Sequence, residues 1–105
     1  MKYEAISSME ELVLLSIVAL ESDAYAYAIK EEIRIQTGRS PALGTIHTIL
    51  YRMENKGFVK SDLGGSSAKR GGRSKRLFTL TNRGLEIIRE IQSSREALWN
   101  KISLT

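Results

Sequence analysis

The most constraining feature of this 105-residue chain is the stretch from Pro41 to Val59, which reads PALGTIHTILYRMENKGFV. Within it, apolar residues recur at three- and four-residue spacing, the pattern of one face of an α-helix. The apolar stripe comprises Leu43, Ile46, Leu50 and Met53. We therefore expect a helix that packs this stripe into a core and ends at Gly57.

The opposite side of the same helix is polar. At about 100° per residue it carries Gly44, Thr48, Tyr51 and Asn55, flanked by Thr45, His47, Arg52 and Lys56. Hydroxyl, amide and guanidinium groups can hydrogen-bond to base edges and phosphates. The pattern favours a helix that enters a nucleic-acid groove, with a solvated surface as the alternative. For His47 alone, a bond to its own neighbourhood is an equal alternative.

The positive charge of the chain is concentrated in its middle third. Residues 39–76 contain nine Lys or Arg side chains and two acidic ones, whereas residues 1–38 contain three and seven. Much of the excess lies in a Gly-rich run whose cations are Lys69, Arg70, Arg73, Lys75 and Arg76. Glycines let such cations follow a phosphate backbone, so the run predicts contact with a polyanion. A solubilising loop is the alternative.

The rest of the chain predicts a mainly α protein with one small β-hairpin. Ser8 and Glu11 fit a capping box before an apolar helix that we expect to be surrounded by neighbours. A second helix should end at Gly38, which suits a left-handed cap, and a tight break then leads into the polar-faced helix. Two helices in this order form a helix-turn-helix.

Two β-prone segments, 58–63 and 77–80, flank the basic run and predict a hairpin. A basic hairpin beside a helix-turn-helix is the wing of a winged helix, so residues 1–80 are expected to form a winged helix-turn-helix domain.

The last segment, 81–105, predicts a helix that begins after Thr81 and serves in dimerisation. Apolar residues repeat along it in near-heptad steps, interrupted by Arg95. The expected homodimer interface comprises Ile88, Ile91, Arg95, Leu98, Trp99 and Ile102. Trp99 also motivates a small flat aromatic effector at this seam, although Trp99, Tyr25 and Tyr27 are by default core residues.

Composition excludes several classes of site. Without cysteine there is neither a disulfide nor a thiolate-bound metal, and a single histidine provides no zinc site. No partner for His47 completes a catalytic group, so we expect no enzyme, metal or cofactor. The run LVLLSIVAL is too short to cross a bilayer, which predicts a cytoplasmic protein without a membrane partner.

The segments LGTIHTILYRMENKGFV and GGRSKRLFTLTNRG together resemble the PadR-like (phenolic acid decarboxylase regulator) family of transcriptional regulators. The family's L-T-x-x-G signature appears here as Leu80, Thr81 and Gly84. The family usually has tyrosine at the place of His47 and often proline at that of Thr48. The family aromatic of the second wing strand is Phe78 here, and the single last helix is typical of its shorter members.

The resemblance implies a winged helix-turn-helix repressor that binds operator DNA as a homodimer. We expect Thr45, His47, Thr48, Tyr51 and Arg52 to contact double-stranded DNA at an inverted repeat, with the basic wing clamping the flanking backbone. The alternative from another class is a winged-helix module that binds protein or RNA without operator selectivity.

Overall fold

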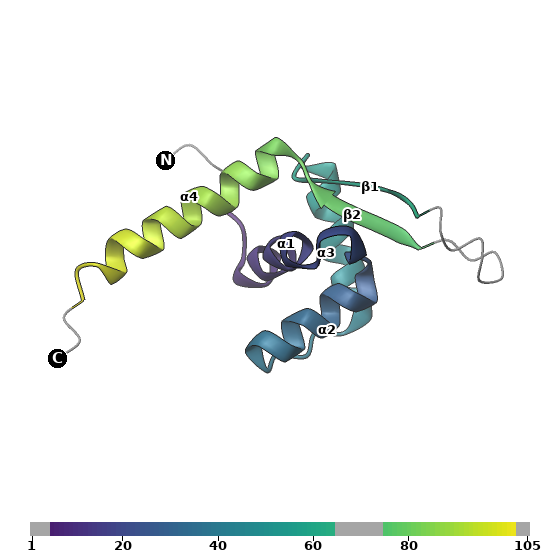
Figure 1. The fold of residues 1–105 in the computed structure, drawn as a ribbon, viewed down its shortest axis with the longest axis horizontal. Coiled ribbons are helices and arrows are strands. Elements are labelled where there is room, and N and C mark those ends of the chain that lie inside the picture. The colour runs from purple at the N-terminus through teal and green to yellow at the C-terminus, as the bar shows by residue number, and fades with distance from the viewer. Residues whose placement is uncertain (1–4, 65–74, 103–105) are drawn as a thin grey trace.

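The computed structural model describes residues 5–64 and 75–102. The described elements are α1 (Ser8–Leu20), a short 3₁₀ turn η1 (Glu21–Asp23), α2 (Ala26–Thr37), α3 (Leu43–Asn55), β1 (Val59–Leu63), β2 (Arg76–Leu80) and α4 (Asn82–Trp99). In Figure 1, α4 runs away from the body formed by α1, α2 and α3, and the β1–β2 hairpin projects in the opposite direction. This order confirms the predicted winged helix with one long C-terminal helix.

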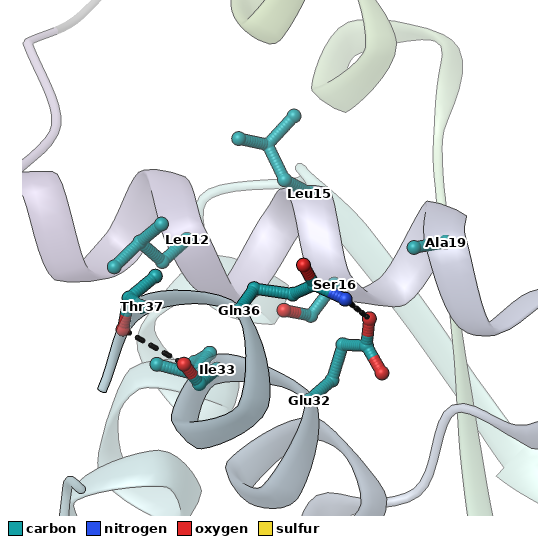
Figure 2. Close-up of a pocket in the computed structure, with 8 residues that line it drawn as sticks. All are labelled: Leu12, Leu15, Ser16, Ala19, Glu32, Ile33, Gln36 and Thr37. Atoms are coloured by element: carbon teal, nitrogen blue, oxygen red, sulfur yellow. Dashed lines mark hydrogen bonds between the residues drawn. The ribbon is translucent and has the colours of Figure 1, made fainter. Parts of the chain in front are cut away.

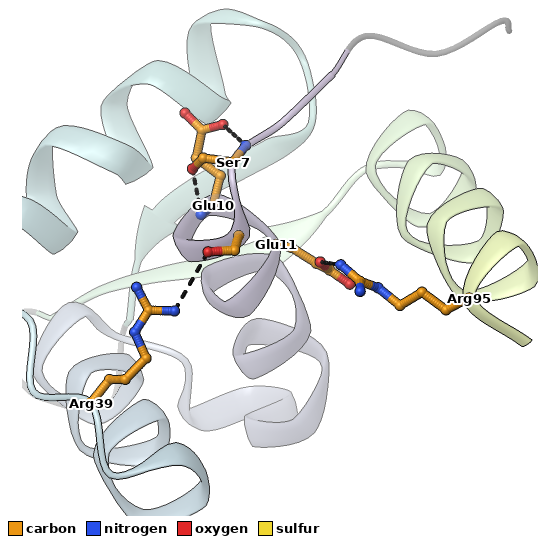
Figure 3. Close-up of polar contacts among 6 residues, drawn as sticks. Ser7, Glu10, Glu11, Arg39 and Arg95 are labelled. Atoms are coloured by element: carbon orange, nitrogen blue, oxygen red, sulfur yellow. Dashed lines mark hydrogen bonds and ion pairs between the residues drawn. The ribbon is translucent and has the colours of Figure 1, made fainter. Parts of the chain in front are cut away.

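The capping box of α1 lies one residue earlier than the sequence pattern indicated. The Glu10 backbone N–H donates to Ser7 Oγ at 3.1 Å, and the Ser7 N–H donates to Glu10 Oε1 at 2.8 Å (Figure 3). The predicted box of Ser8 and Glu11 is therefore wrong. Glu11 instead accepts a 2.7 Å bond from Arg95 of α4, so its carboxylate is held by a distant helix.

The turn between α2 and α3 confirms the helix-turn-helix. Gly38 caps α2 in the left-handed conformation at φ 77°, and its N–H donates to the Arg34 carbonyl. A second glycine, Gly57, has φ 83° directly after α3. Both positions need a conformation that only glycine adopts without strain, which is why α2 and α3 end where they do.

The core lies where α1, α2, α3, the hairpin and the first half of α4 meet. From α3 it receives Ile46, Ile49, Leu50 and Met53. The prediction of the apolar stripe was wrong at two positions. Leu43 was included but is 38% exposed, and Ile49 was left out but is buried. Leu43 lies at the first position of α3, beyond the reach of the core, whereas Ile49 faces it.

The hairpin is antiparallel, with Val59 opposite Leu80 and Leu63 opposite Arg76. Its base is attached to the helical body by backbone bonds. The Phe78 N–H donates to the Ala24 carbonyl and the Phe58 N–H donates to the Met53 carbonyl, both at 2.9 Å. The wing therefore begins from a base that is fixed against α3 and against Ala24, which precedes α2.

The helix α4 is anchored at its first turn. Thr81 accepts a hydrogen bond from the Gly84 N–H, which confirms the predicted N-cap. Gly84 passes so close to β1 that an added Cβ would lie 2.2 Å from the Phe58 carbonyl oxygen. Among the described residues, no single helix is long and apolar enough to cross a membrane.

Candidate nucleic-acid interface

The outward face of α3 is polar and accessible. Thr45, His47, Thr48 and Tyr51 are all exposed, and the Tyr51 side chain is 70% exposed. On the opposite face, Ile46, Leu50 and Met53 are almost completely buried. Burial of the apolar stripe thus fixes which side of α3 meets solvent, and that side carries the residues predicted to contact DNA.

One of these side chains is already oriented by the helix. The Thr48 hydroxyl donates to the Gly44 carbonyl at 3.0 Å. A hydroxyl that uses its hydrogen in this way still accepts through its oxygen. Thr48 is therefore suited to accept a hydrogen bond from a base amino group, while its methyl group can contact thymine.

Arg52 has an intramolecular role that the sequence pattern did not reveal. Its Nε donates to Glu10 Oε2 at 2.9 Å, and Glu10 is only 7% exposed. Burial raises the pKa of Glu10, but the bonds from the Ser7 N–H and the Arg52 guanidinium outweigh it, and the pKa is lowered overall. Arg52 thus ties α3 to the start of α1 while half of its side chain stays exposed.

An open hollow lies between the start of α1 and the first half of α3. Its walls include the Ser7, Thr45 and Thr48 side chains, with Arg52 at one side and the apolar Met9 and Ile49 beneath. Hydroxyls beside a guanidinium are the usual protein ligands of a phosphate oxygen. The hollow therefore places groups that can bind a phosphate next to the exposed polar face of α3.

The wing residues within the described part of the chain have partners of their own. The Lys75 ammonium lies over the Tyr25 ring, 4.0 Å from its centroid. Arg76 Nη1 donates to Ser61 Oγ at 3.0 Å. Lys69, Arg70 and Arg73, the other predicted wing contacts, lie outside the described residues.

A second hollow of about 330 Å³ separates α3 from the hairpin. His47, Tyr51 and Glu54 line it from α3, and Arg76 and Phe78 line it from β2. The hollow brings one predicted helix contact, His47, into the same recess as one predicted wing contact, Arg76. Positions 29 residues apart in sequence thus form a continuous surface.

The predicted dimer residues of α4 divide into two groups. Ile88 is 8% exposed and belongs to the protomer's own core, so its assignment to the interface is corrected. Ile91 packs against that core, and Arg95 Nη2 pairs with Glu11 Oε1 at 2.7 Å (Figure 3). Beyond Arg95, the apolar residues at the end of α4 and just after it are exposed: Leu98 at 67%, Trp99 at 60% and, after the helix, Ile102 at 48%.

The helix α1 is not surrounded, contrary to expectation. Leu15 and Val18 are 43% and 45% exposed. A groove of about 220 Å³ lies between α1 and α2, and its lining includes Leu15 from α1 and Glu32 and Gln36 from α2. Figure 2 shows the hydrogen bond that Gln36 donates to Glu32. The protomer therefore exposes apolar surface on α1 as well as at the end of α4. Tyr27 is 54% exposed, so neither it nor Trp99 is a core residue.

Sequence reasoning missed Glu10, Ser61 and Glu54, which hold predicted contact residues or link them to the hairpin. Glu10 and Arg52 are 42 residues apart, so no local spacing relates them. The described residues also contain no group of three or more His, Asp or Glu side chains that could hold a metal ion.

Residues 14–90 match the transcriptional regulator PadR-like family. The chain belongs to this family. Its fold, with the polar face of α3 beside a hairpin, is that of a DNA-binding transcriptional regulator. No curated protein matches the sequence.

Several solved structures share this fold. A PadR-like transcriptional regulator from Bacillus cereus is 23% identical with a TM-score of 0.71, over 88% of this chain and 84% of that one. A PadR family transcription regulator from Clostridium difficile is 29% identical with a TM-score of 0.65, over 90% of this chain and 93% of that one. A Streptococcus transcriptional regulator is 19% identical with a TM-score of 0.70, over 93% and 94% of the two chains.

Proposed function

We propose that this chain is a repressor that binds an inverted-repeat operator as a homodimer. The observation that carries the proposal is the exposed polar face of α3, which lies beside the base of a hairpin that belongs to the most basic third of the chain. In a symmetric dimer, two copies of α3 would enter major grooves about 34 Å apart. A dimer bound in this way covers the operator and blocks other proteins from it.

Each group of side chains has a separate role in the proposal. Thr45, His47, Thr48 and Tyr51 contact base edges and nearby phosphates, and Arg52 contacts the backbone while it holds Glu10. The cations Lys69, Arg70, Arg73, Lys75 and Arg76 supply affinity for the flanking backbone. The helix thus contributes sequence choice, and the wing contributes sequence-independent binding.

The dimer is proposed to form through residues 81–105. Leu98, Trp99 and Ile102 form one exposed apolar edge, and the groove beside Leu15 offers an apolar surface on the same protomer. An isologous contact uses such complementary patches twice, once on each protomer.

Trp99 also supports a proposal for an effector, a flat aromatic compound that stacks on the exposed indole at the dimer seam. Because the chain has one tryptophan, its fluorescence reports on this position alone. Titration with a panel of planar aromatic compounds should quench or shift the emission. An emission spectrum unchanged by the whole panel would remove the support for an effector.

The wing assignment is tested by replacing Arg73, Lys75 and Arg76 together with alanine. We expect weaker binding to all duplex sequences and a salt dependence flatter by roughly one for each lost phosphate contact. Fluorescence anisotropy on a labelled duplex across a range of salt concentrations measures both quantities. Unchanged affinity with an unchanged salt slope would show that these cations do not contact the backbone.

A further inference from the structure

Three polar side chains form a chain of hydrogen bonds between α3 and the wing. Arg76 Nη1 donates to Ser61 Oγ at 3.0 Å, and Ser61 Oγ donates to Glu54 Oε2 at 3.0 Å. Arg76 belongs to β2, Ser61 to β1 and Glu54 to the last turn of α3. We name this set of three residues the α3–wing brace.

We propose that Glu54 and Ser61 are positioning residues for DNA binding: they hold the hairpin, and the Arg76 guanidinium with it, at a fixed place relative to α3. This inference rests on the proposed DNA-binding function. It goes beyond that function because neither Glu54 nor Ser61 is among the residues expected to touch DNA.

The Ser61 hydroxyl at the centre of the brace sets the donor and acceptor of each hydrogen bond. Ser61 has a single O–H, which it gives to Glu54, so its oxygen is left to accept from Arg76. Both bonds have an ionised group at one end and are therefore charge-assisted. Arg76 has five N–H donors, and the brace uses one of them. The brace thus fixes the guanidinium at one end and leaves its remaining donors for a phosphate.

The brace spans an open recess between α3 and the outer part of the hairpin. The hollow of about 330 Å³ between them is lined by Glu54 and Arg76 themselves. On its other side β2 is held more firmly, by the bond from the Phe78 N–H to the Ala24 carbonyl and by Lys75 over the Tyr25 ring. Near its base the hairpin is also held to α3, by the bond from the Phe58 N–H to the Met53 carbonyl at 2.9 Å. Without the brace, the outer part of the hairpin that carries Arg76 would lose its side-chain link to α3 across the hollow.

The negative charge of Glu54 allows two explanations of a change in DNA affinity to be separated. A carboxylate on the exposed side of α3 repels phosphates, so its removal alone should strengthen DNA binding. If Glu54 positions the wing, its removal should weaken binding instead. The sign of the change therefore separates the positioning role from simple electrostatics.

The experiment compares Glu54→Ala and Ser61→Ala with Asp62→Ala on a labelled mixed-sequence duplex across a range of salt concentrations. Asp62 is an exposed carboxylate on the same hairpin, and the described residues offer it no ion-pair partner, so it controls for charge. We expect Glu54→Ala and Ser61→Ala to weaken binding about threefold to tenfold, because the hairpin and its Arg76 guanidinium would no longer be held beside α3. Asp62→Ala should bind as tightly as wild type or more tightly.

Rescue by Ser61→Thr provides a readout that general destabilisation would not give, because threonine keeps the hydroxyl and suits a strand. Wild-type affinity in Ser61→Thr supports the brace. Binding by Glu54→Ala that is as tight as that of Asp62→Ala would overturn the brace and leave the DNA-binding proposal intact. Binding by Ser61→Ala that is as tight as that of wild type would also overturn it, because the hydroxyl is the link between Arg76 and Glu54. Failure of the wild type to bind the duplex would overturn the proposed function as well.

Discussion

The helices α3 and α4 are both amphipathic, but they differ in how much of the apolar stripe is buried within the protomer. The apolar stripe of α3 is buried in its own protomer from Ile46 to Met53, and the exposed face opposite this stripe is polar. In α4 the stripe is buried as far as Ile88, while Leu98 and Trp99 near its end are exposed. A helix with a buried stripe presents a polar face to a polar partner, whereas a helix with an exposed apolar end requires an apolar one.

Hydrophobic periodicity alone therefore does not show whether an apolar stripe is buried within its own protomer. Both stripes look alike in the sequence, yet one lies inside the protomer and the other is half outside it. We infer that α3 is the surface for DNA and the end of α4 the surface for a second copy of the chain. The following predictions test that division, from the largest expected effect to the smallest.

Leu98→Glu should have the largest effect. A charge in the apolar end of α4 should separate the proposed dimer and lower operator affinity by about 100-fold, because the two half-sites would no longer be bound together. Sedimentation velocity and operator titration measure the two quantities. The matched control is Ile35→Glu on α2, whose side chain is 62% exposed and lies outside α4. Equal oligomeric states for both variants would contradict the role of α4.

Gly84→Ala should destabilise the fold by about 2–3 kcal/mol, since the added Cβ would lie 2.2 Å from the Phe58 carbonyl oxygen. Thermal and urea unfolding measure the change. Gly44→Ala is its control in α3, because no atom lies within 4 Å of an added Cβ there, and it should stabilise by about 0.5–1 kcal/mol. If both variants were equally stable, the close approach of α4 to β1 would not be a constraint.

Glu10→Gln should cost about 1–2 kcal/mol, because it weakens the bonds to Ser7 and Arg52 at a nearly buried site. Since folding lowers the pKa of Glu10, the unfolded state binds more protons, and the contribution is complete above the ordinary carboxyl pKa. It should disappear as the pH falls through the lowered pKa of the folded state. Urea unfolding at neutral and acidic pH tests this, with the exposed Glu90→Gln as control. A difference between the two variants that did not shrink in acid would contradict the ion-pair explanation.

Tyr51→Ala should change stability least, by less than about 0.5 kcal/mol, because its side chain is 70% exposed. Operator affinity should nevertheless fall about fivefold, with less effect on unrelated duplexes. Anisotropy titrations on the two kinds of duplex make the comparison. A uniform loss on both would assign Tyr51 to the phosphate backbone rather than to base edges.

Much of the fold could be predicted because its signals are local. Gly38 after α2 and Thr81 before α4 mark helix ends through their own conformation and hydrogen bonding, and both predictions are confirmed. The capping box of α1 was displaced by one residue because two serines are followed by two glutamates, so both registers satisfy the spacing. In the structure Glu10 pairs with Arg52 and Glu11 with Arg95, and both contacts come from distant helices that the local spacing does not reveal.

The candidate site was predicted less completely for the same reason. The exposed face of α3 follows from periodicity, but the pairing of Arg52 with Glu10 and the brace from Arg76 to Glu54 depend on tertiary structure. Ile88 shows the same limit, because a near-heptad pattern does not distinguish a residue of the protomer core from one of an interface.

The most direct test of the division between α3 and α4 is a random-sequence DNA selection carried out in parallel with wild type and Leu98→Glu. We predict an inverted repeat with two half-sites for the wild type and a single half-site for the variant, because base reading by α3 would persist without the dimer. An absence of enrichment with the wild type would contradict the account and favour a winged-helix module that binds protein or RNA. An inverted repeat recovered equally by both proteins would contradict the role assigned to the end of α4.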